Sequence, residues 1–380
     1  MRHSIRSICL VVASEMTVTA FLRRHIIALS DSYDVTLVVN TQSHDFAAKL
    51  GLPVKVVPLA IERRIAPIAD FKALHRLIRL FRRQQFDLVH SVTPKAGLLA
   101  MLAGKISGVR FRIHTFTGQV WATRQGFSRI FLKGMDRMLA SSATHLLADS
   151  FSQRQFLVEQ GVAQEGKINV LADGSISGVD AERFRPNNVV RREIRDQFAV
   201  SDDAVLLLFL GRLNRDKGVL DLSKAFMDVS ETCPQLHLLF VGPDEGKLKD
   251  EIKRMTEKQT LQVHFVDHTD KPEAYFASAD IFCLPSYREG FGSVIIEAAA
   301  CGVPAIGSRI YGISDAIVEG QTGMLFETGD ISALSNAIER MTCDSDFRHL
   351  LGKGALRRAR DDFPTKRLVQ AWIDYYDGLQ

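Results

Sequence analysis

Two glutamates, Glu289 and Glu297, lie eight positions apart in the segment YREGFGSVIIEAAACGVPAIGS (287–308). Gly290 and Gly292 stand between them, where a strand-like apolar run gives way to an alanine-rich helical pattern. Glycines allow the backbone to approach a ligand closely, and the first amides of a helix have no intrahelical acceptor. Carboxylates beside such amides can accept hydrogen bonds from neighbouring sugar hydroxyls. Acids stabilised by the helix dipole are the simpler alternative, but this alternative does not explain the doublet around Gly-Phe-Gly.

Two basic residues have a comparable setting in FLGRLNRDKGVLDL (209–222). Arg212 follows a strand-like run that ends at Gly211, and Lys217 comes just before the next helical pattern. Ligands of open α/β sheets bind beyond the carboxyl ends of the strands, where helix N-termini favour anions. A planar guanidinium and a mobile ammonium group together suit a diphosphate. Two solvated surface charges are the alternative interpretation.

Regular elements must position these side chains, and the first half of the chain alternates short apolar runs with helical patterns. Strands are expected at 7–14, 34–40, 54–60, 86–92, 110–116 and 144–150. Helices are expected between them, at 17–30, 70–84, 95–107 and 152–160. Buried strands that alternate with helices predict a parallel sheet with right-handed crossovers.

A turn-rich segment at 173–188 interrupts this pattern and is the expected linker. Strand-like runs then resume at 204–211, 237–242, 263–267, 281–286, 304–308 and 323–327. The predicted fold class is therefore α/β, with two doubly wound, Rossmann-like domains in series. The expected domains are 1–186 and 187–364, with a closing helix at 365–380 that packs back towards the first domain.

Composition limits the class of protein. The 380 residues carry a net charge of +4, but residues 1–186 hold 25 basic and 14 acidic side chains, and the remainder holds 23 and 30. Opposite charges suggest different partners for the two halves. No segment approaches the roughly 20 apolar residues of a membrane span, and the apolar run at 8–13 is shorter than a typical signal-peptide core. The five scattered cysteines suggest neither a disulfide framework nor a zinc site, and a reducing cytosol fits them.

The acidic and basic pairs, in this order and on this fold, resemble the family 4 retaining glycosyltransferases of the glycosyltransferase-B fold. The family's Glu-x7-Glu motif matches Glu289 and Glu297, and its preceding Arg/Lys pair matches Arg212 and Lys217. The similarity is dense in the second half and loose in the first. It extends to LFVGPDEG (239–246), ASADIFCLPS (277–286), ACGVPAIGS (300–308) and GQTGMLF (320–326).

The resemblance implies that the two domains face a cleft, and it implies a role for each matched residue. Arg212 and Lys217 would hold the donor diphosphate, Glu289 would contact the transferred sugar, and these three form the predicted catalytic set. Glu297 would bind the nucleotide ribose. Other predicted donor-binding residues line the same turns: Gly211, Gly242, Gly290, Phe291, Gly292, Ser293 and Val294.

The resemblance also implies the donor and the reaction. The donor would be a UDP-sugar, and neither a cofactor nor a metal ion is expected, because the acidic pairs in SDDA (201–204) and RDDF (360–363) are poor metal-binding matches. Retention would follow from front-face attack, in which the leaving phosphate accepts the acceptor's proton and no protein nucleophile is needed.

The acceptor is expected in the first domain, because the resemblance narrows to bacterial enzymes that extend undecaprenyl-diphosphate-linked sugars in O-antigen, capsule or glycan assembly. Lys95 opens a predicted helix behind Pro94 and would meet the lipid diphosphate. An exposed lysine on a helix is the alternative. Glu15 lies in the first turn, where relatives often have glycines, and would meet an acceptor hydroxyl.

A departure from the family occurs in RIHTFTGQVWATRQGFSR (112–129). Thr117 precedes Gly118, where many relatives carry a histidine near the reacting carbon, and His114 lies three residues earlier. Thr117 and His114 are both predicted to serve the acceptor side. His114 as a core histidine, or substitution by Gln119 and Arg124, are the alternatives.

A basic, amphipathic segment at 63–85 suggests contact with an anionic membrane surface. A core-facing helix with a solvated basic face explains it equally well. The expected location is cytoplasmic and peripheral on the inner membrane, and no nucleic-acid partner is expected.

The predicted function is retaining transfer of a sugar, expected to be an N-acetylhexosamine, from a UDP-sugar to a lipid-linked saccharide. A UDP-sugar 2-epimerase of the same fold and a non-catalytic partner subunit are the alternatives. A dinucleotide-dependent dehydrogenase is disfavoured, because no GxGxxG follows the first strand of either domain.

Overall fold

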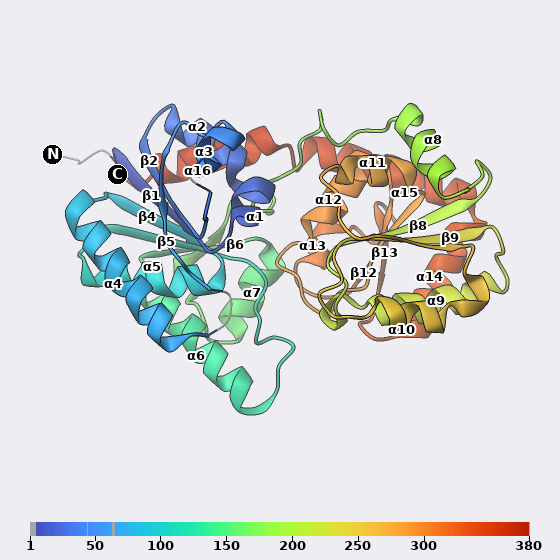
Figure 1. Cartoon of the computed structure of the whole chain (residues 1–380), viewed down its shortest axis with the longest axis horizontal. Coiled ribbons are helices and arrows are strands. Elements are labelled where there is room, and N and C mark those ends of the chain that lie inside the picture. The colour runs from blue at the N-terminus through green and yellow to red at the C-terminus, as the bar shows by residue number, and fades with distance from the viewer. Residues whose placement is uncertain (1–4, 44, 63–64, 380) are drawn as a thin grey trace. The chain divides into compact units, whose positions relative to one another are not determined.

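The computed structural model describes residues 5–43, 45–62 and 65–379, which form two compact units. One unit comprises Met1–Ser177 with Thr365–Gln380, and the other comprises Gly178–Pro364. Each unit contains one parallel sheet with helices on both faces (Figure 1). The division falls earlier in the chain than the expected 186, and the closing helix belongs to the first unit.

The first sheet has seven parallel strands in the order β3-β2-β1-β4-β5-β6-β7. Their bounds are β1 Ser7–Val12, β2 Asp34–Val39, β3 Lys55–Pro58, β4 Leu88–Val92, β5 Phe111–Phe116, β6 His145–Ala148 and β7 Ile168–Val170. The helices of the first unit are α1 Glu15–Thr17, α2 Arg23–Ser30, α3 Phe46–Leu50, α4 Pro67–Gln84, α5 Pro94–Ile106, α6 Gly126–Ser142, α7 Phe151–Glu159 and α16 Thr365–Asp377. A π-helical segment, η1 Val18–Leu22, joins α1 to α2.

The second sheet has six parallel strands in the order β10-β9-β8-β11-β12-β13. Their bounds are β8 Val205–Leu210, β9 Leu236–Val241, β10 Val263–Val266, β11 Ile281–Leu284, β12 Ala305–Ser308 and β13 Gly323–Phe326. The helices of the second unit are α8 Asn188–Gln197, α9 Val219–Ser230, α10 Lys249–Met255, α11 Pro272–Ser278, α12 Ser293–Ala300, α13 Ile313–Ala316, α14 Ile331–Cys343 and α15 Ser345–Asp361. Short 3₁₀ turns are η2 Glu165–Lys167 in the first unit and η3 Arg215–Lys217 and η4 Glu257–Gln259 in the second.

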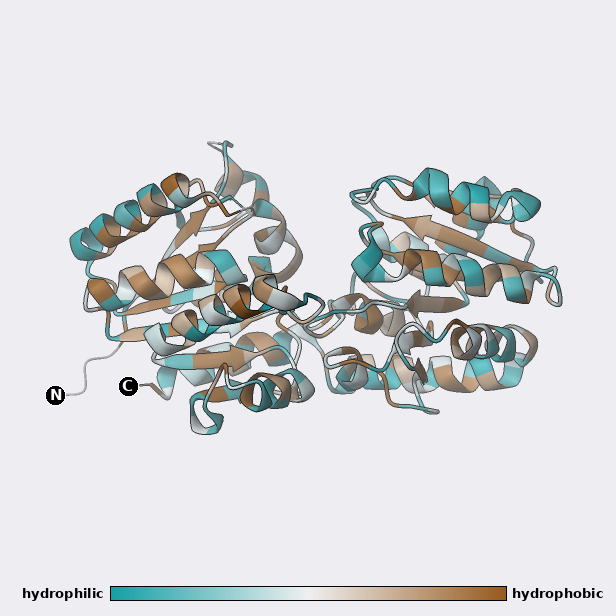
Figure 2. Ribbon diagram, turned by 90° about the horizontal axis from the view of Figure 1, so that it is seen from below, coloured by the Kyte–Doolittle hydropathy of each residue, from teal (hydrophilic) through white to brown (hydrophobic). Residues whose placement is uncertain are grey.

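Continuous apolar runs form the central strands because helices cover both faces of each sheet. All five residues of β4 and the first five of β8 are buried. Figure 2 shows the same division, with brown strands inside and teal residues along the outer helices. The predicted α/β class with two doubly wound, Rossmann-like units is confirmed.

The closing helix α16 packs against α2 in the first unit, as its red colour among the blue elements shows (Figure 1). The Trp372 ring stacks on His90 of β4 with centroids 4.5 Å apart. Tyr376 hydrogen-bonds His90 Nδ1 through its hydroxyl at 2.5 Å. The Tyr33 hydroxyl donates to Asp377 Oδ1 at 2.6 Å. Aromatic stacking and buried hydrogen bonds therefore fix the end of the chain to the first sheet.

The amphipathic segment at 63–85 becomes α4, whose apolar stripe faces inwards. Leu77 and Phe81 are buried, whereas Phe71 at the start of the helix is 72% exposed. Arg63 and Arg64 lie outside the described residues. The stripe is therefore mainly core packing. Across the described part of the chain, no helix is long and apolar enough to cross a membrane.

Candidate functional site

The loops after β8 and β11 meet because these two strands are neighbours in the second sheet. Lys217 ends the 3₁₀ turn η3, and its Nζ donates a hydrogen bond to Glu289 Oε1. Both side chains are mostly buried, with 18% and 15% of their surface exposed. Two residues 72 positions apart in the sequence are thus joined at the carboxyl edge of the sheet.

Arg212 occupies the same edge but contacts a different acid. Its Nη1 lies 2.6 Å from Glu245 Oε2, and both side chains are about two-fifths exposed. Glu245 belongs to the loop after β9, the strand beside β8. Each member of the predicted basic pair therefore contacts a carboxylate from the loop after one of the two strands that flank β8.

Glycines let these loops approach one another. A Cβ on Gly242, where φ is +137°, would lie 2.0 Å from the carbonyl oxygen of Gly211. A Cβ on Gly312 would lie 2.5 Å from the carbonyl oxygen of Gly290. Side chains at these positions would push the strand ends apart, so the glycines are required by the packing of the loops around the site.

The start of α12 presents backbone rather than side chains. Gly292 is the N-cap with φ of +80°, and no side chain caps the helix among the described residues. The helix begins at Ser293 and Val294, whose amides precede the first intrahelical bonds. The Phe291 side chain is buried and packs on Phe363 with ring centroids 5.2 Å apart. Only the backbone of Phe291 is therefore available to a ligand.

Glu297 lies one turn into α12 in a different environment from Glu289. Burial raises the pKa of its carboxyl to about 7, Arg183 opposes this shift and Glu273 adds to it. Arg183 and Glu273 form an ion pair at 2.8 Å. The spacing of eight therefore separates the acids into two settings, one beside Lys217 and one beside an existing ion pair.

In the first unit, each predicted residue has contacts of its own. Glu15 begins α1 and accepts a hydrogen bond from Thr41 Oγ1, at the carboxyl ends of β1 and β2. Lys95 forms an ion pair with Asp70 of α4 at 2.6 Å and has only 13% of its side chain exposed. The simple alternative of a freely exposed lysine is therefore wrong.

Thr117 follows β5 and takes part in a network of amides. Its carbonyl oxygen accepts from Gln119 Nε2 at 2.6 Å and from Gln153 Nε2 at 2.5 Å. Gln119 and Gln153 are buried. These two buried side chains hydrogen-bond the backbone at Thr117 and thereby fix the conformation of the loop. Arg124 of the same loop is exposed.

His114 requires a correction. Its side chain is fully buried in β5, and Nδ1 lies 2.9 Å from Ser91 Oγ. A Cβ on Gly97 would lie 2.3 Å from His114 Cε1, so the ring packs directly on α5. Burial lowers its pKa to about 3. The expectation that His114 contacts an acceptor is wrong, because the ring fills the space between sheet and helix.

Asp149 is a residue of interest that the sequence analysis missed. It follows β6, beside Thr117 in the strand register, and only 6% of its surface is exposed. Within the described residues, nothing hydrogen-bonds its Oδ1, and burial raises its pKa to about 8. One acid after a strand is a common pattern, so no sequence signal separated it from ordinary surface acids.

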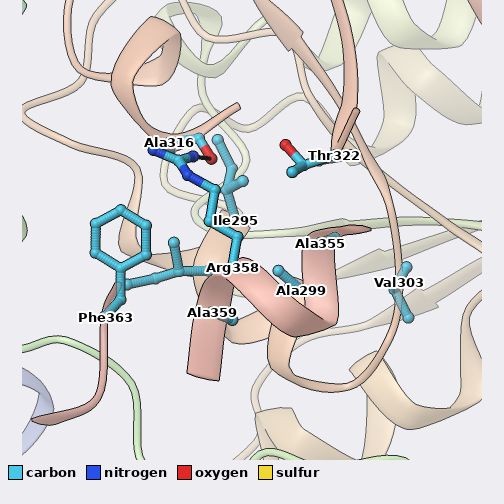
Figure 3. Close-up of a pocket in the computed structure, with 11 residues that line it drawn as sticks. Ile295, Ala299, Val303, Ala316, Thr322, Ala355, Arg358, Ala359 and Phe363 are labelled. Carbon is cyan, nitrogen blue, oxygen red and sulfur yellow. Dashed lines mark hydrogen bonds between the residues drawn. The ribbon is translucent and has the colours of Figure 1, made fainter. Parts of the chain in front are cut away.

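A small hollow in the second unit is a packing feature (Figure 3). Its Arg358 donates to the carbonyl oxygens of Ala316 and Asp315 at 2.6 and 2.7 Å. The guanidinium is thus used within the fold. The remaining lining is mainly apolar and comprises Ile295, Ile296, Ala299, Val303, Ala305, Ala316, Thr322, Ala355, Ala359 and Phe363.

Comparisons with known families match both halves of the chain. The model described as "Glycosyl transferases group 1" matches residues 190–358, and the "Glycosyl transferase 4-like domain" model matches residues 17–174. These matches include all the donor-side residues named above in the second unit.

Two curated relatives align with most of the chain. The capsular polysaccharide biosynthesis glycosyltransferase CapM of Staphylococcus aureus is 31% identical over 85% of this chain and 84% of its own length. The UDP-Gal:alpha-D-GlcNAc-diphosphoundecaprenol alpha-1,3-galactosyltransferase of Escherichia coli is 26% identical over 83% of this chain and 81% of its own length.

Solved structures agree on the architecture. HepE from Anabaena in complex with UDP superposes with a TM-score of 0.79 at 18% identity, covering 98% of this chain and 100% of that one. Sucrose-phosphate synthase from Thermosynechococcus elongatus superposes with a TM-score of 0.79 at 21% identity, covering 98% of this chain and 99% of that one. These likenesses confirm the predicted fold of two Rossmann-like domains.

Proposed function

The chain belongs to the family of glycosyl transferases group 1, and on this premise we propose that it transfers a sugar from a UDP-sugar to an undecaprenyl-diphosphate-linked saccharide in cell-surface polysaccharide synthesis. The contact between Lys217 and Glu289 carries the proposal, because it gathers a cation and a carboxylate from two loops at the ligand-binding edge of the sheet. The UDP complex of HepE and the names of the two curated relatives support the donor and the acceptor class.

Lys217 and Arg212 would bind the diphosphate and stabilise the charge that develops on the leaving UDP. Fixed cations in a partly buried site stabilise such charge without reorganising during the reaction. Each cation now holds a carboxylate, Glu289 or Glu245. A diphosphate that takes over Lys217 would release Glu289 to accept hydrogen bonds from the sugar hydroxyls. Binding of the phosphate would thereby prepare the sugar-binding carboxylate.

The nucleotide would extend along α12. The amides of Ser293 and Val294 would donate to phosphate or sugar oxygens, since a helix N-terminus favours anions. Glu297 would receive the ribose hydroxyls one turn further on, close to Arg183 and Glu273. Gly211, Gly242, Gly290 and Gly292 would shape the backbone around the diphosphate.

The reaction is proposed to proceed with retention and without a metal ion. The acceptor oxygen would attack from the face that the UDP leaves, and the departing phosphate would accept the acceptor's proton. The cations of this chain would balance the leaving-group charge. EDTA should then leave turnover intact, whereas a loss of turnover that magnesium restores would contradict metal independence.

The acceptor side is proposed to use the first unit. Glu15 and Thr117 would contact the acceptor saccharide, and Lys95 would face its lipid diphosphate while Asp70 orients the ammonium group. This assignment implies a cytoplasmic protein that works at the inner face of the membrane.

A donor screen tests the function. Purified protein would be given UDP-N-acetylhexosamines and UDP-hexoses with membranes that hold lipid-linked saccharides, and products would be measured by mass spectrometry. Growth of the lipid-linked saccharide by one N-acetylhexosamine is expected, and growth by a hexose would correct the sugar alone. Conversion of a UDP-sugar without any acceptor would favour a 2-epimerase. No turnover of any donor would favour a non-catalytic partner subunit.

A further inference from the structure

The outer face of α6 exposes a cluster of large apolar side chains. Phe127 is 81% exposed, Ile130 71%, Phe131 46% and Met138 44%. The rings of Phe127 and Phe131 stack with centroids 6.2 Å apart. Ile130 and Phe131 lie three and four residues after Phe127, and Met138 lies seven residues, or about two turns, after Phe131, so all four lie along one side of the helix. We call these four residues the α6 face.

This face is additional to the side of α6 that packs into the fold. Leu139 and Ala140 are buried and supply the inner contacts, and α6 packs against α5 (Figure 1). In α4, by contrast, the main apolar stripe at Ala73, Leu77 and Phe81 is consumed by such packing. Contiguous apolar side chains in water mark an interaction surface more reliably than scattered ones.

The same helix carries three basic side chains that have no acidic partners among the described residues. Arg129 and Lys133 both donate to Gln160 Oε1, at 3.4 and 2.9 Å, and Arg137 donates to the carbonyl oxygen of Gly161. Over the described residues, no acid pairs with these three cations or with Arg124. The nearby charges of Arg137 and Arg129 add to burial in lowering the pKa of Lys133.

The only acid between residues 117 and 142 is withdrawn from this surface. Asp136 is 7% exposed and accepts a hydrogen bond from Trp121 Nε1 at 2.7 Å. Trp121 is itself buried and stacks on Phe156 with centroids 5.3 Å apart. The loop before α6 is therefore anchored, so the exposed aromatic residues stand on a fixed support with a net positive rim.

We propose that the α6 face docks the protein on an anionic phospholipid bilayer, with Phe127, Ile130 and Phe131 entering the headgroup region. Apolar side chains bordered by cations match such a surface in both polarity and charge, and they bind it more tightly as its anionic lipid content rises. A second copy of the chain is a poorer fit, because two positive rims would repel each other. The inference deepens the proposed function by placing the membrane contact on α6 rather than α4.

Vesicle co-sedimentation tests the proposal. Wild-type protein should bind vesicles of phosphatidylglycerol mixed with phosphatidylcholine, and bind phosphatidylcholine alone weakly. The double variant Phe127→Ser/Phe131→Ser should lower the partition coefficient by at least about tenfold, since two largely exposed rings no longer enter the bilayer. Leu261→Ser, at an 86% exposed position in the second unit, is the matched control and should bind like wild type. Added salt should weaken wild-type binding.

Three outcomes would overturn the proposal: no wild-type binding to anionic vesicles, equal binding by the double variant, or a dimer in light scattering that the double variant abolishes without any vesicle binding. Circular dichroism checks that the variants fold. Vesicle binding needs no turnover, and the double variant should keep wild-type UDP release with a short-chain, water-soluble acceptor. Failure of docking and failure of the proposed reaction are therefore distinguishable.

Discussion

The carboxyl edges of the two sheets use polar groups differently. In the second sheet, side chains from separate loops pair across the edge, as Lys217 with Glu289 and Arg212 with Glu245. In the first sheet, Lys95 forms an ion pair with Asp70, but the groups around Thr117 are neutral amides, because Gln119 and Gln153 donate to its carbonyl oxygen. Asp149 Oδ1 has no hydrogen-bond partner among the described residues. The charged edge of the second sheet suits a diphosphate, and the neutral amides around Thr117 suit hydroxyls. The difference supports the proposal that the second unit recognises the nucleotide and the first unit recognises the acceptor.

The largest effect is expected from substitutions of the Lys217–Glu289 pair, at the charged edge of the second sheet. Lys217→Ala and Glu289→Ala should each lower acceptor-dependent UDP release by about 10²–10³-fold, the usual cost of losing one group that stabilises transition-state charge. Lys249→Ala removes an ion pair with Asp267 elsewhere in the same unit and serves as control. A near-normal kcat in both site variants would show that Lys217 and Glu289 do not take part in catalysis.

Arg212 should matter less, because it is more exposed than Lys217 and solvent screens its charge. Arg212→Ala is expected to reduce kcat/KM for the donor by about tenfold to 100-fold, or about 1.4–2.7 kcal/mol. Glu245→Gln removes its partner and should not lower donor affinity. Steady-state kinetics over a range of donor concentrations compares both variants, and a larger loss in Glu245→Gln would show that the ion pair itself is required.

Substitution of Lys95 in the first unit should affect the acceptor alone. Lys95→Gln should raise the acceptor KM by about tenfold while the donor KM stays unchanged, because a point charge facing a phosphate is worth about 1–2 kcal/mol. Asp70→Asn is the matched variant, since it leaves the lysine but removes its orienting partner. A change in the donor KM of Lys95→Gln would show that this lysine contacts the donor and not the acceptor.

The smallest effect concerns stability and its dependence on pH. Burial raises the pKa of Asp149 to about 8, whereas an unfolded aspartate titrates near 3.9. Between these values the unfolded chain releases a proton that the folded protein retains, so the free energy of unfolding falls as pH rises through this window. The melting temperature of Asp149→Asn should therefore be at least about 2–4 °C above that of the wild type at pH 7. Near pH 4 the two melting temperatures should be equal.

Calorimetry across this pH range measures the difference, with Asp202→Asn as the exposed control. A constant difference at every pH would show that the carboxyl of Asp149 is ionised in the fold, and the edge of the first sheet would then not be neutral.

The sheets could be predicted well from the sequence, because short apolar runs that alternate with helical patterns mark buried parallel strands. It missed β7, whose three residues are too few to form a recognisable run. The loops at Gly211 and Gly290 were predicted because glycine at a strand end has few structural alternatives. The pairing of Arg212 with Glu245 was not, since contacts between loops after neighbouring strands depend on strand order. His114 was misassigned because β5 is covered on both faces, so a polar side chain within this strand is core whichever way it points.

The central claim is that UDP is held by the loops after β8 and β11, and calorimetric titration of UDP tests it most directly. Lys217→Ala should raise the Kd for UDP by at least about tenfold, while Lys95→Gln in the first unit leaves it unchanged. A Kd that rises in Lys95→Gln and stays at the wild-type value in Lys217→Ala would contradict the account.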